Sequence, residues 1–242
     1  MVFFSSRVHP GETPASYVLH GIIDFLISPD PAAQILRDNI IFKIVPMLNP
    51  DGVFLGNYRC SYMGFDLNRH WQCPSMWSQP AIAATKKMLL EYATSPGTQL
   101  DFYIDIHAHT TMMNGFMYGN VREDEEHHER EQALPRLLDT ISRDFAYRNT
   151  IFNRDPVKAG SARRSMDELL APLGTHSYTL EVSFYCARDD LRCMSAPFTP
   201  ETYMGLGRDV CEAIMEWYKL PNPRRKRAGM TGTPSTTPYE VM

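Results

Sequence analysis

The stretch RVHPGETP, residues 7–14, stands where a short apolar run ends and an amphipathic run begins. Val2–Ser6 predicts a short buried strand, and Thr13 to about Ser28 predicts a helix with Thr13 at its N-cap. A bound metal ion would explain why His9 and Glu12 stand three residues apart at this junction. A helix N-terminus that favours a carboxylate, preceded by an incidental histidine, would explain them as well.

Composition places the chain among ordinary globular proteins. Its 242 residues, 43% of them hydrophobic and 21% charged, suffice for one sizeable α/β domain. A net charge of -4 gives no sign of nucleic-acid binding, and no apolar run is long enough to span a membrane. The odd number of cysteines and the lack of a CxxC pair predict reduced thiols in a cytosolic protein. The cysteines are Cys60, Cys73, Cys186, Cys193 and Cys211.

Strand and helix patterns alternate along the chain, which predicts an α/β layer fold. The further strands are expected at Ile40–Pro46, Leu100–Ala108, Phe116–Asn120 and Ser177–Phe184. The further helices are expected at Ala32–Asp38, Ala81–Thr94, Glu123–Phe145, with a fresh segment at Pro135, and Pro200–Leu220. We expect one domain over residues 1–220 and a disordered tail over residues 221–242, which is rich in Pro, Gly, Thr and charge.

Metal-binding and acid–base side chains stand at the ends of three predicted strands. His9 and Glu12 follow the first, His107 lies near the end of another, and Glu181 lies in a third. Sites in open α/β sheets gather at the carboxyl ends of strands. Two histidines and one carboxylate form a three-ligand zinc site with an open fourth position, where zinc lowers the pKa of a bound water to about 7. Glu181 is then the candidate to accept a proton from that water.

Each of these residues also has a structural explanation. An HxxE pair occurs often by chance, and His107 would serve equally as a buried histidine bonded to a backbone carbonyl. His109 is a rival ligand, because side chains two residues apart in a strand lie on the same face. Glu181 is harder to explain, since a carboxylate buried in an apolar strand is costly without a partner or a function.

A long segment with little periodicity, Leu48–Ser78, separates the first metal candidates from the later ones. Loops of this length in compact domains are usually functional. It carries the NPDG turn and two arginines, Arg59 and Arg69, whose guanidinium groups suit a substrate carboxylate or a developing oxyanion. Either arginine alone would be read as a surface charge.

The chain resembles the zinc carboxypeptidase family, and within it the cytosolic carboxypeptidase branch. The resemblance covers roughly residues 3–220 and rests on motifs that occur in the family's order. They are HPGE, LNPDG, NYRCS, GFDLNRHW, DIHAH, KAGSARR and YTLEVSFY. It implies a zinc carboxypeptidase-like α/β fold with a mixed, mostly buried central sheet flanked by helices. It also implies a metallocarboxypeptidase activity in which a single zinc ion is the cofactor.

The resemblance also implies roles for individual residues. His9, Glu12 and His107 match the zinc ligands, Glu181 matches the general base and acid, and Arg59 matches the residue that polarises the scissile carbonyl. The implied reaction is removal of glutamates from polyglutamylated proteins, tubulin above all. The implied location is the cytosol, with the centriole or the base of the cilium as particular sites.

Substrate-binding candidates come from two motifs. Asn68 and Arg69 match the family's pair that grips the terminal carboxylate of the substrate. A protein of net charge -4 that acts on polyglutamate must concentrate positive charge at its cleft, and KAGSARR supplies Lys158, Arg163 and Arg164. We expect Arg163, or failing it Arg164, to meet the side-chain carboxylate of the departing glutamate, and at least one of the two to be a surface charge.

Family catalytic domains place further strands before HPGE, whereas here the first matched strand begins within two residues of Met1. The sheet is therefore expected to lack its N-terminal strands, which would expose Val2–Ser6 at a sheet edge or on one face. Two alternative functions stay open at this point. One is a zinc amidohydrolase acting on small acyl-amino acids, and the other is an inactive, truncated form that binds acidic tails.

Overall fold

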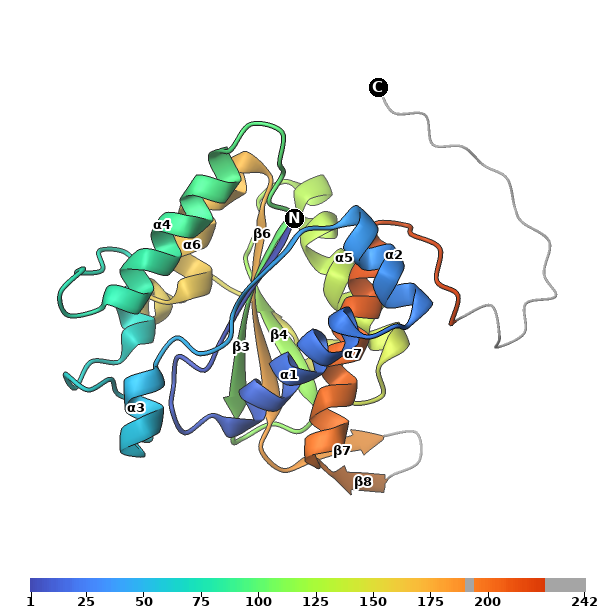
Figure 1. The fold of residues 1–242 in the computed structure, drawn as a ribbon, viewed down its shortest axis with the longest axis horizontal. Coiled ribbons are helices and arrows are strands. Elements are labelled where there is room, and N and C mark those ends of the chain that lie inside the picture. Colours follow the sequence, from blue (N-terminus) through green and yellow to red (C-terminus); the bar gives the residue numbers. More distant parts are fainter. Residues whose placement is uncertain (190–193, 225–242) are drawn as a thin grey trace.

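The computed structural model describes residues 1–189 and 194–224 (Figure 1). A six-stranded sheet in the order β2-β1-β3-β6-β4-β5 forms its centre. Its strands are β1 (Val2–Ser6), β2 (Phe42–Val45), β3 (Phe102–His109), β4 (Gly115–Gly119), β5 (Ile151–Phe152) and β6 (His176–Ser183). Only the β4–β6 pair is antiparallel among these neighbours, so the predicted mixed sheet is confirmed. A separate antiparallel hairpin joins β7 (Cys186–Asp189) to β8 (Met194–Pro197).

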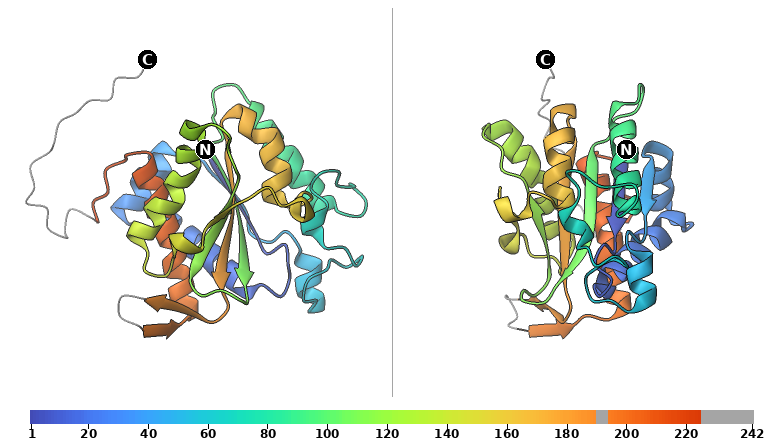
Figure 2. Two further views of the ribbon diagram at one scale, coloured as in Figure 1. Left: turned by 180° about the vertical axis from the view of Figure 1, so that it is seen from behind. Right: turned by 90° about the vertical axis from the view of Figure 1, so that its left-hand side faces the viewer.

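Helices cover both faces of the sheet (Figures 1 and 2). They are α1 (Thr13–Ile27), α2 (Pro31–Asn39), α3 (Pro50–Leu55), α4 (Pro80–Thr94), α5 (Glu125–Ile141), α6 (Ala162–Leu170) and α7 (Pro200–Trp217). One core cluster joins α1, α2, α5 and α7 to one face, and a second joins α4 and α6 to the other. Successive strand residues alternate between the two clusters, as the period of a strand requires: Val2 and Phe4 belong to the first and Phe3 to the second.

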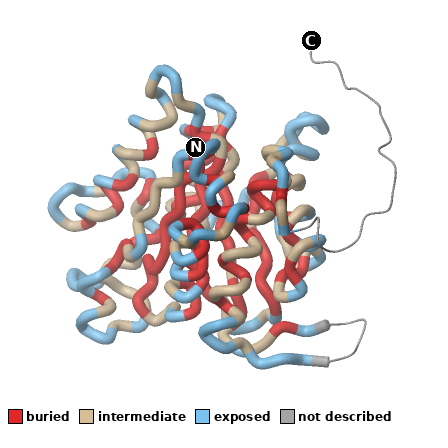
Figure 3. The backbone as a smooth tube through the Cα atoms, turned by 45° about the vertical axis from the view of Figure 1, so that its right-hand side comes forward, coloured by how far each residue is buried: buried red, intermediate tan, exposed pale blue. Residues whose placement is uncertain are grey.

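Strand β1 lies inside the sheet, not at its edge. It pairs in parallel with β2 on one side and with β3 on the other, and Val2–Ser6 are all buried. Buried backbone fills the interior of the molecule, and exposed segments lie around it (Figure 3). The expectation that Val2–Ser6 would be exposed is therefore wrong. The neighbour on the outer side is supplied by Phe42–Val45 of the same chain, which returns to the sheet after α1 and α2.

Helix α5 runs without interruption through Pro135, where a fresh helical segment was expected. Proline lacks the N–H that would bond to the carbonyl four residues earlier, so it normally breaks a helix. Here that carbonyl belongs to Glu131, and it accepts a hydrogen bond of 2.7 Å from the hydroxyl of Tyr178 on β6. The side chain of a distant strand therefore replaces the missing backbone donor.

Three further sequence expectations are corrected at helix starts. The helix α1 begins at Thr13, so the cap position falls on Glu12 and not on Thr13. The NPDG stretch does not form an isolated turn: Asn49 caps α3 by accepting from the N–H of Gly52 at 3.0 Å. The KAGSARR stretch, for which no helix was expected, opens α6 with Ser161 as its N-cap. The serine cap before an amphipathic run was the signal for α6.

No helix within the described ranges is both long enough and apolar enough to cross a membrane. The four cysteines that the structure describes, at positions 60, 73, 186 and 211, are free thiols. Arg224 is the last described residue, and it pairs with Asp30 at 2.8 Å and with Glu212 at 3.0 Å. The rest of the predicted disordered tail lies outside the described residues.

Candidate metal centre

The turn between β1 and α1 places His9 and Glu12 at the carboxyl end of the sheet. It begins at Arg7, whose φ of 56° is unusual for a residue other than glycine. The Arg7 guanidinium stabilises this turn by donating from Nε to the carbonyl of Pro10 at 2.8 Å and from Nη1 to the hydroxyl of Ser16 at 2.7 Å. The side chains after β1 are therefore fixed relative to the first turn of α1.

Three side chains from distant parts of the chain converge beside this turn. The Nδ1 atom of His9 lies 2.6 Å from one carboxylate oxygen of Glu12, and the Nδ1 atom of His107 lies 3.0 Å from the other. Possible ligand atoms of the three residues all lie within 4.8 Å of one another, and both histidines are buried. Two imidazole nitrogens and a carboxylate are a ligand set that zinc accepts in catalytic sites.

The Nε2 atoms of both histidines contact carboxylates that were not predicted from the sequence. His9 Nε2 lies 3.1 Å from Asp66 Oδ1, and His107 Nε2 lies 2.7 Å from Asp105 Oδ2. Such a carboxylate accepts the N–H at Nε2 of a metal-binding histidine and leaves Nδ1 free to bind the ion. This donor arrangement fits a metal ion held on Nδ1 of each ring. Asp105 was detectable in sequence, since it stands two residues before His107 on the same strand face.

Electrostatics around these side chains are strong. Burial acts to lower the pKa of His107, yet the charges of Asp105 and Glu12 raise it well above its usual value. Burial acts to raise the pKa of Glu12, yet His107 and His9 hold it well below its usual range. Without a metal the cluster is thus balanced by protonated histidine against ionised carboxylates. A divalent cation would replace those protons, because histidine binds metal in its neutral form.

Glu181 lies beside this cluster on the neighbouring strand. In the parallel pairing of β3 and β6 it is the register partner of His107. Its Oε2 atom is buried and has no hydrogen-bond partner among the described residues. Burial, aided by the nearby charge of Glu12, raises the pKa of Glu181 to about 7. A carboxyl group with this pKa can gain and lose a proton near neutral pH.

A cleft of about 250 Å³ opens over the cluster. Its walls include the three residues that the sequence analysis assigned from the long segment Leu48–Ser78: Arg59, Asn68 and Arg69. Arg59 donates from Nε to Asp66 at 2.8 Å, and Arg69 donates to the carbonyl of Asn68 at 2.9 Å. The Asn68 side chain accepts from the N–H of Ala162 at 2.8 Å, which fixes the start of α6 against the cleft.

The three basic side chains of KAGSARR lie in different places. Lys158 lines the cleft, where its Nζ atom lies 4.0 Å from the ring centroid of Tyr118. Arg163 also lines the cleft, but its guanidinium is buried and donates to the carbonyl of Gly119 and the side chain of Asn120, both at 2.6 Å. Arg164 is not among the residues that line the cleft.

His109, the rival ligand, faces the same cleft but stands outside the three-residue cluster. Its Nδ1 atom accepts from the backbone N–H groups of Thr111 at 3.1 Å and Met112 at 3.2 Å. Its ring packs edge-on against Phe116, with centroids 5.2 Å apart. The nitrogen that faces these two N–H groups is therefore already engaged.

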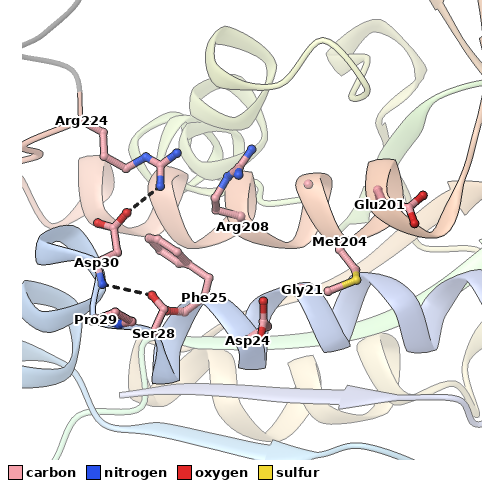
Figure 4. Close-up of a pocket in the computed structure, with 11 residues that line it drawn as sticks. Gly21, Asp24, Phe25, Ser28, Pro29, Asp30, Glu201, Met204, Arg208 and Arg224 are labelled. Atoms are coloured by element: carbon pink, nitrogen blue, oxygen red, sulfur yellow. Dashed lines mark hydrogen bonds and ion pairs between the residues drawn. The ribbon is translucent and has the colours of Figure 1, made fainter.

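A larger cavity, of about 620 Å³, lies between α1 and α7, and none of its lining residues belongs to the cluster (Figure 4). Its charged side chains include Asp30 and Arg224, which pair with each other across it. The glycines Gly21 and Gly205 contribute to its wall. The groups suited to chemistry are thus gathered in the smaller cleft.

Comparison with known proteins agrees with this geometry. Residues 1–187 match the zinc carboxypeptidase family. The chain is 54% identical to cytosolic carboxypeptidase 6 of Mus musculus over 91% of its own length and 41% of that protein's. It is 47% identical to the protein of the same name from Caenorhabditis elegans, over 90% of this chain and 49% of that one. The chain therefore spans about half or less of the length of these curated relatives.

A solved structure supports the same assignment. A metallo-carboxypeptidase from Burkholderia cenocepacia superposes with a TM-score of 0.76 at 26% identity, covering 90% of this chain and 56% of that one. The family match covers most of the chain, and the mixed sheet flanked by helices is the fold that this match implies. The chain belongs to the zinc carboxypeptidase family, in its cytosolic carboxypeptidase branch.

Proposed function

We propose that this chain is the catalytic part of a zinc carboxypeptidase that removes glutamates from polyglutamylated protein tails, with tubulin as the leading substrate, in the cytosol. The observation that carries the proposal is the unpaired carboxylate oxygen of Glu181, buried beside a cluster of His9, Glu12 and His107. A buried carboxylate without a partner is costly, and such a group next to a metal-type cluster has the chemistry of a general base. The family membership supports hydrolysis of C-terminal residues.

His9, Glu12 and His107 are the residues that would hold the zinc ion. When bound, zinc supplies a Lewis acid that polarises a carbonyl and lowers the pKa of water. Glu181 accepts a proton from the attacking water and then delivers it to the leaving amine, which its pKa of about 7 permits. One residue thus acts in turn as base and acid.

The long segment holds the substrate in this scheme. Arg59 stands at the cleft with its Nε and Nη2 atoms on Asp66, which orients the remaining guanidinium edge for a developing oxyanion. Asn68 and Arg69 bind the terminal carboxylate of the substrate. Contacts at both the scissile carbonyl and the terminal carboxylate hold the substrate in the orientation that the reaction requires.

Glutamate is the favoured substrate because positive charge is concentrated in the cleft. Arg59, Arg69, Lys158 and Arg163 line it although the whole chain carries a net charge of -4. Burial lowers the pKa of Lys158, and the charge of Glu181 acts against this shift. Lys158 is half-buried, and its ammonium lies over the Tyr118 ring. It has no hydrogen bond to a side chain among the described residues. Its ammonium is therefore available to the side-chain carboxylate of a bound glutamate. Arg163 supports the wall behind it.

Zinc binding distinguishes the two histidines of DIHAH. We expect His107→Ala to weaken zinc binding at least about 100-fold, because it removes one of three ligands, and His109→Ala to leave zinc affinity within about threefold of the parent. Competition with a chromophoric chelator measures both constants. Loss of zinc from His109→Ala together with retention in His107→Ala would reverse the ligand assignment.

Turnover tests Glu181. Glu181→Gln should keep zinc and substrate binding but lower the rate of glutamate release by at least about 100-fold, the usual scale of general acid–base catalysis. The measurement is release of free glutamate from a synthetic peptide with a polyglutamate tail. Glu168→Gln, which changes an exposed carboxylate on α6, is the matched control and should behave as the parent. Parent-like release by Glu181→Gln would remove this residue from the mechanism.

Specificity tests the basic wall. Lys158→Met should lower kcat/KM for a peptide ending in Glu, relative to one ending in Leu, by about tenfold or more, since a charged hydrogen bond is lost. Lys87→Met is the matched control, because its lysine is exposed on α4. Arg163→Leu and Arg164→Leu, assayed in the same way, show which arginine contributes. If every variant keeps the glutamate preference of the parent, the charges of this segment do not set specificity.

A further inference from the structure

Behind the candidate metal centre lies a chain of buried polar groups that links β1 to β3. Ser5 is the register partner of Asp105 in the parallel pairing of these strands. The Ser5 hydroxyl donates to Asp105 Oδ1 at 2.6 Å, and the Tyr103 hydroxyl lies 3.0 Å from the same Ser5 oxygen. All three side chains are fully buried. The other oxygen of Asp105 lies 2.7 Å from His107 Nε2.

The direction of each hydrogen bond among these buried groups follows from which atoms can donate and which can accept. An ionised carboxylate only accepts, so the single hydroxyl proton of Ser5 points to Asp105. The Ser5 oxygen can then accept the proton of Tyr103. With one oxygen of Asp105 occupied by Ser5, its other oxygen accepts the N–H at His107 Nε2. His107 Nδ1, which faces Glu12, is then the nitrogen whose proton a metal ion would replace.

We propose that Ser5 and Tyr103 are positioning residues of the metal centre, which hold Asp105 so that His107 presents Nδ1 to the ion. The inference rests on the metal site of the proposed function. Neither residue touches the cluster itself. Both act through Asp105, the carboxylate that fixes the tautomer and the orientation of the imidazole ring.

Asp105 has fewer hydrogen-bond donors around it than Asp66 has, so the Ser5 hydroxyl matters more to its orientation. Asp66, which contacts His9, is partly exposed and is also held by Arg59 and by the N–H of Asn68 at 3.0 Å. Asp105 is fully buried, and no lysine or arginine contacts it in the described part of the chain. Without the Ser5 hydroxyl, Oδ1 of Asp105 would be left without a donor, and both oxygens would compete for the N–H at His107 Nε2.

The neighbouring serine supplies a matched control. Ser6 is also buried on β1, but its hydroxyl oxygen has no partner among the described residues. Ser5→Ala and Ser6→Ala therefore remove the same atom from adjacent positions of one strand. Only the first of these changes interrupts the chain to His107.

The experiment is chelator competition for zinc with the parent, Ser5→Ala, Tyr103→Phe and Ser6→Ala, in the absence of substrate. We expect about tenfold weaker zinc binding for Ser5→Ala, a smaller loss for Tyr103→Phe, and a parent-like constant for Ser6→Ala. Denaturant unfolding of each metal-free variant measures any general loss of stability separately. If Ser5→Ala fails to fold, Tyr103→Phe decides the question, because it removes the hydroxyl at the far end of the hydrogen-bonded series from Tyr103 to His107.

The outcomes separate this inference from the function it rests on. Zinc affinities equal to the parent in both Ser5→Ala and Tyr103→Phe would overturn the positioning role while leaving the zinc site intact. Equal weakening by Ser5→Ala and Ser6→Ala would also overturn it, since the effect would then belong to the strand and not to the hydroxyl chain. A parent chain that binds no zinc would overturn the metal site and this inference together.

Discussion

The register between the parallel strands β1, β3 and β6 is the constraint on which the site depends. It places Ser5 beside Asp105, and His107 beside Glu181, so that the side chains proposed to support, bind and react stand on adjacent strands. Because these strands run in the same direction, their carboxyl ends meet at one edge of the sheet. A shift of one residue in either pairing would turn these side chains to the opposite face. The core on both faces of the sheet therefore stabilises the geometry of the site as well as the fold.

Charge compensation is the second feature that unifies the site. Glu12 and Asp105 contact His107, and Asp66 contacts His9 and Arg59, so each of these carboxylates has a cationic or polar partner. Buried charges in proteins are paired in this way because an isolated one is costly. Glu181 departs from the rule, with one oxygen left unpaired beside the cluster. That exception distinguishes the group proposed to react from the groups that hold the site in place.

Much of this arrangement could be predicted from the sequence, because it rests on local patterns. The strand Val2–Ser6 and the helix that starts at Thr13 follow from apolar periodicity, and the strand ending in DIHAH from its apolar run. The residues that the structure gathers at the cleft were chosen from motif and residue type, and their roles are tested only by the experiments above. Asp105 lay within reach of the same reasoning, through its spacing from His107.

The features that could not be predicted depend on contacts between distant residues. The interior place of β1 depends on β2, which joins it from beyond two helices. The unbroken helix at Pro135 depends on the hydroxyl of Tyr178, a residue of another strand. The pairing of Asp66 with His9 joins residues that are 57 positions apart in the sequence. In each case a local rule is overridden by a partner that the sequence does not place nearby.

In this interpretation the parallel strands assemble one metal site on the Nδ1 atoms of His9 and His107. The most direct measurement is a crystal structure of the zinc-loaded protein with anomalous scattering at the zinc edge. We expect a single zinc ion bound by Nδ1 of His9, Nδ1 of His107 and the carboxylate of Glu12, at about 2.0–2.2 Å. Zinc bound to His109, or to the Nε2 atoms that face Asp66 and Asp105, would contradict it.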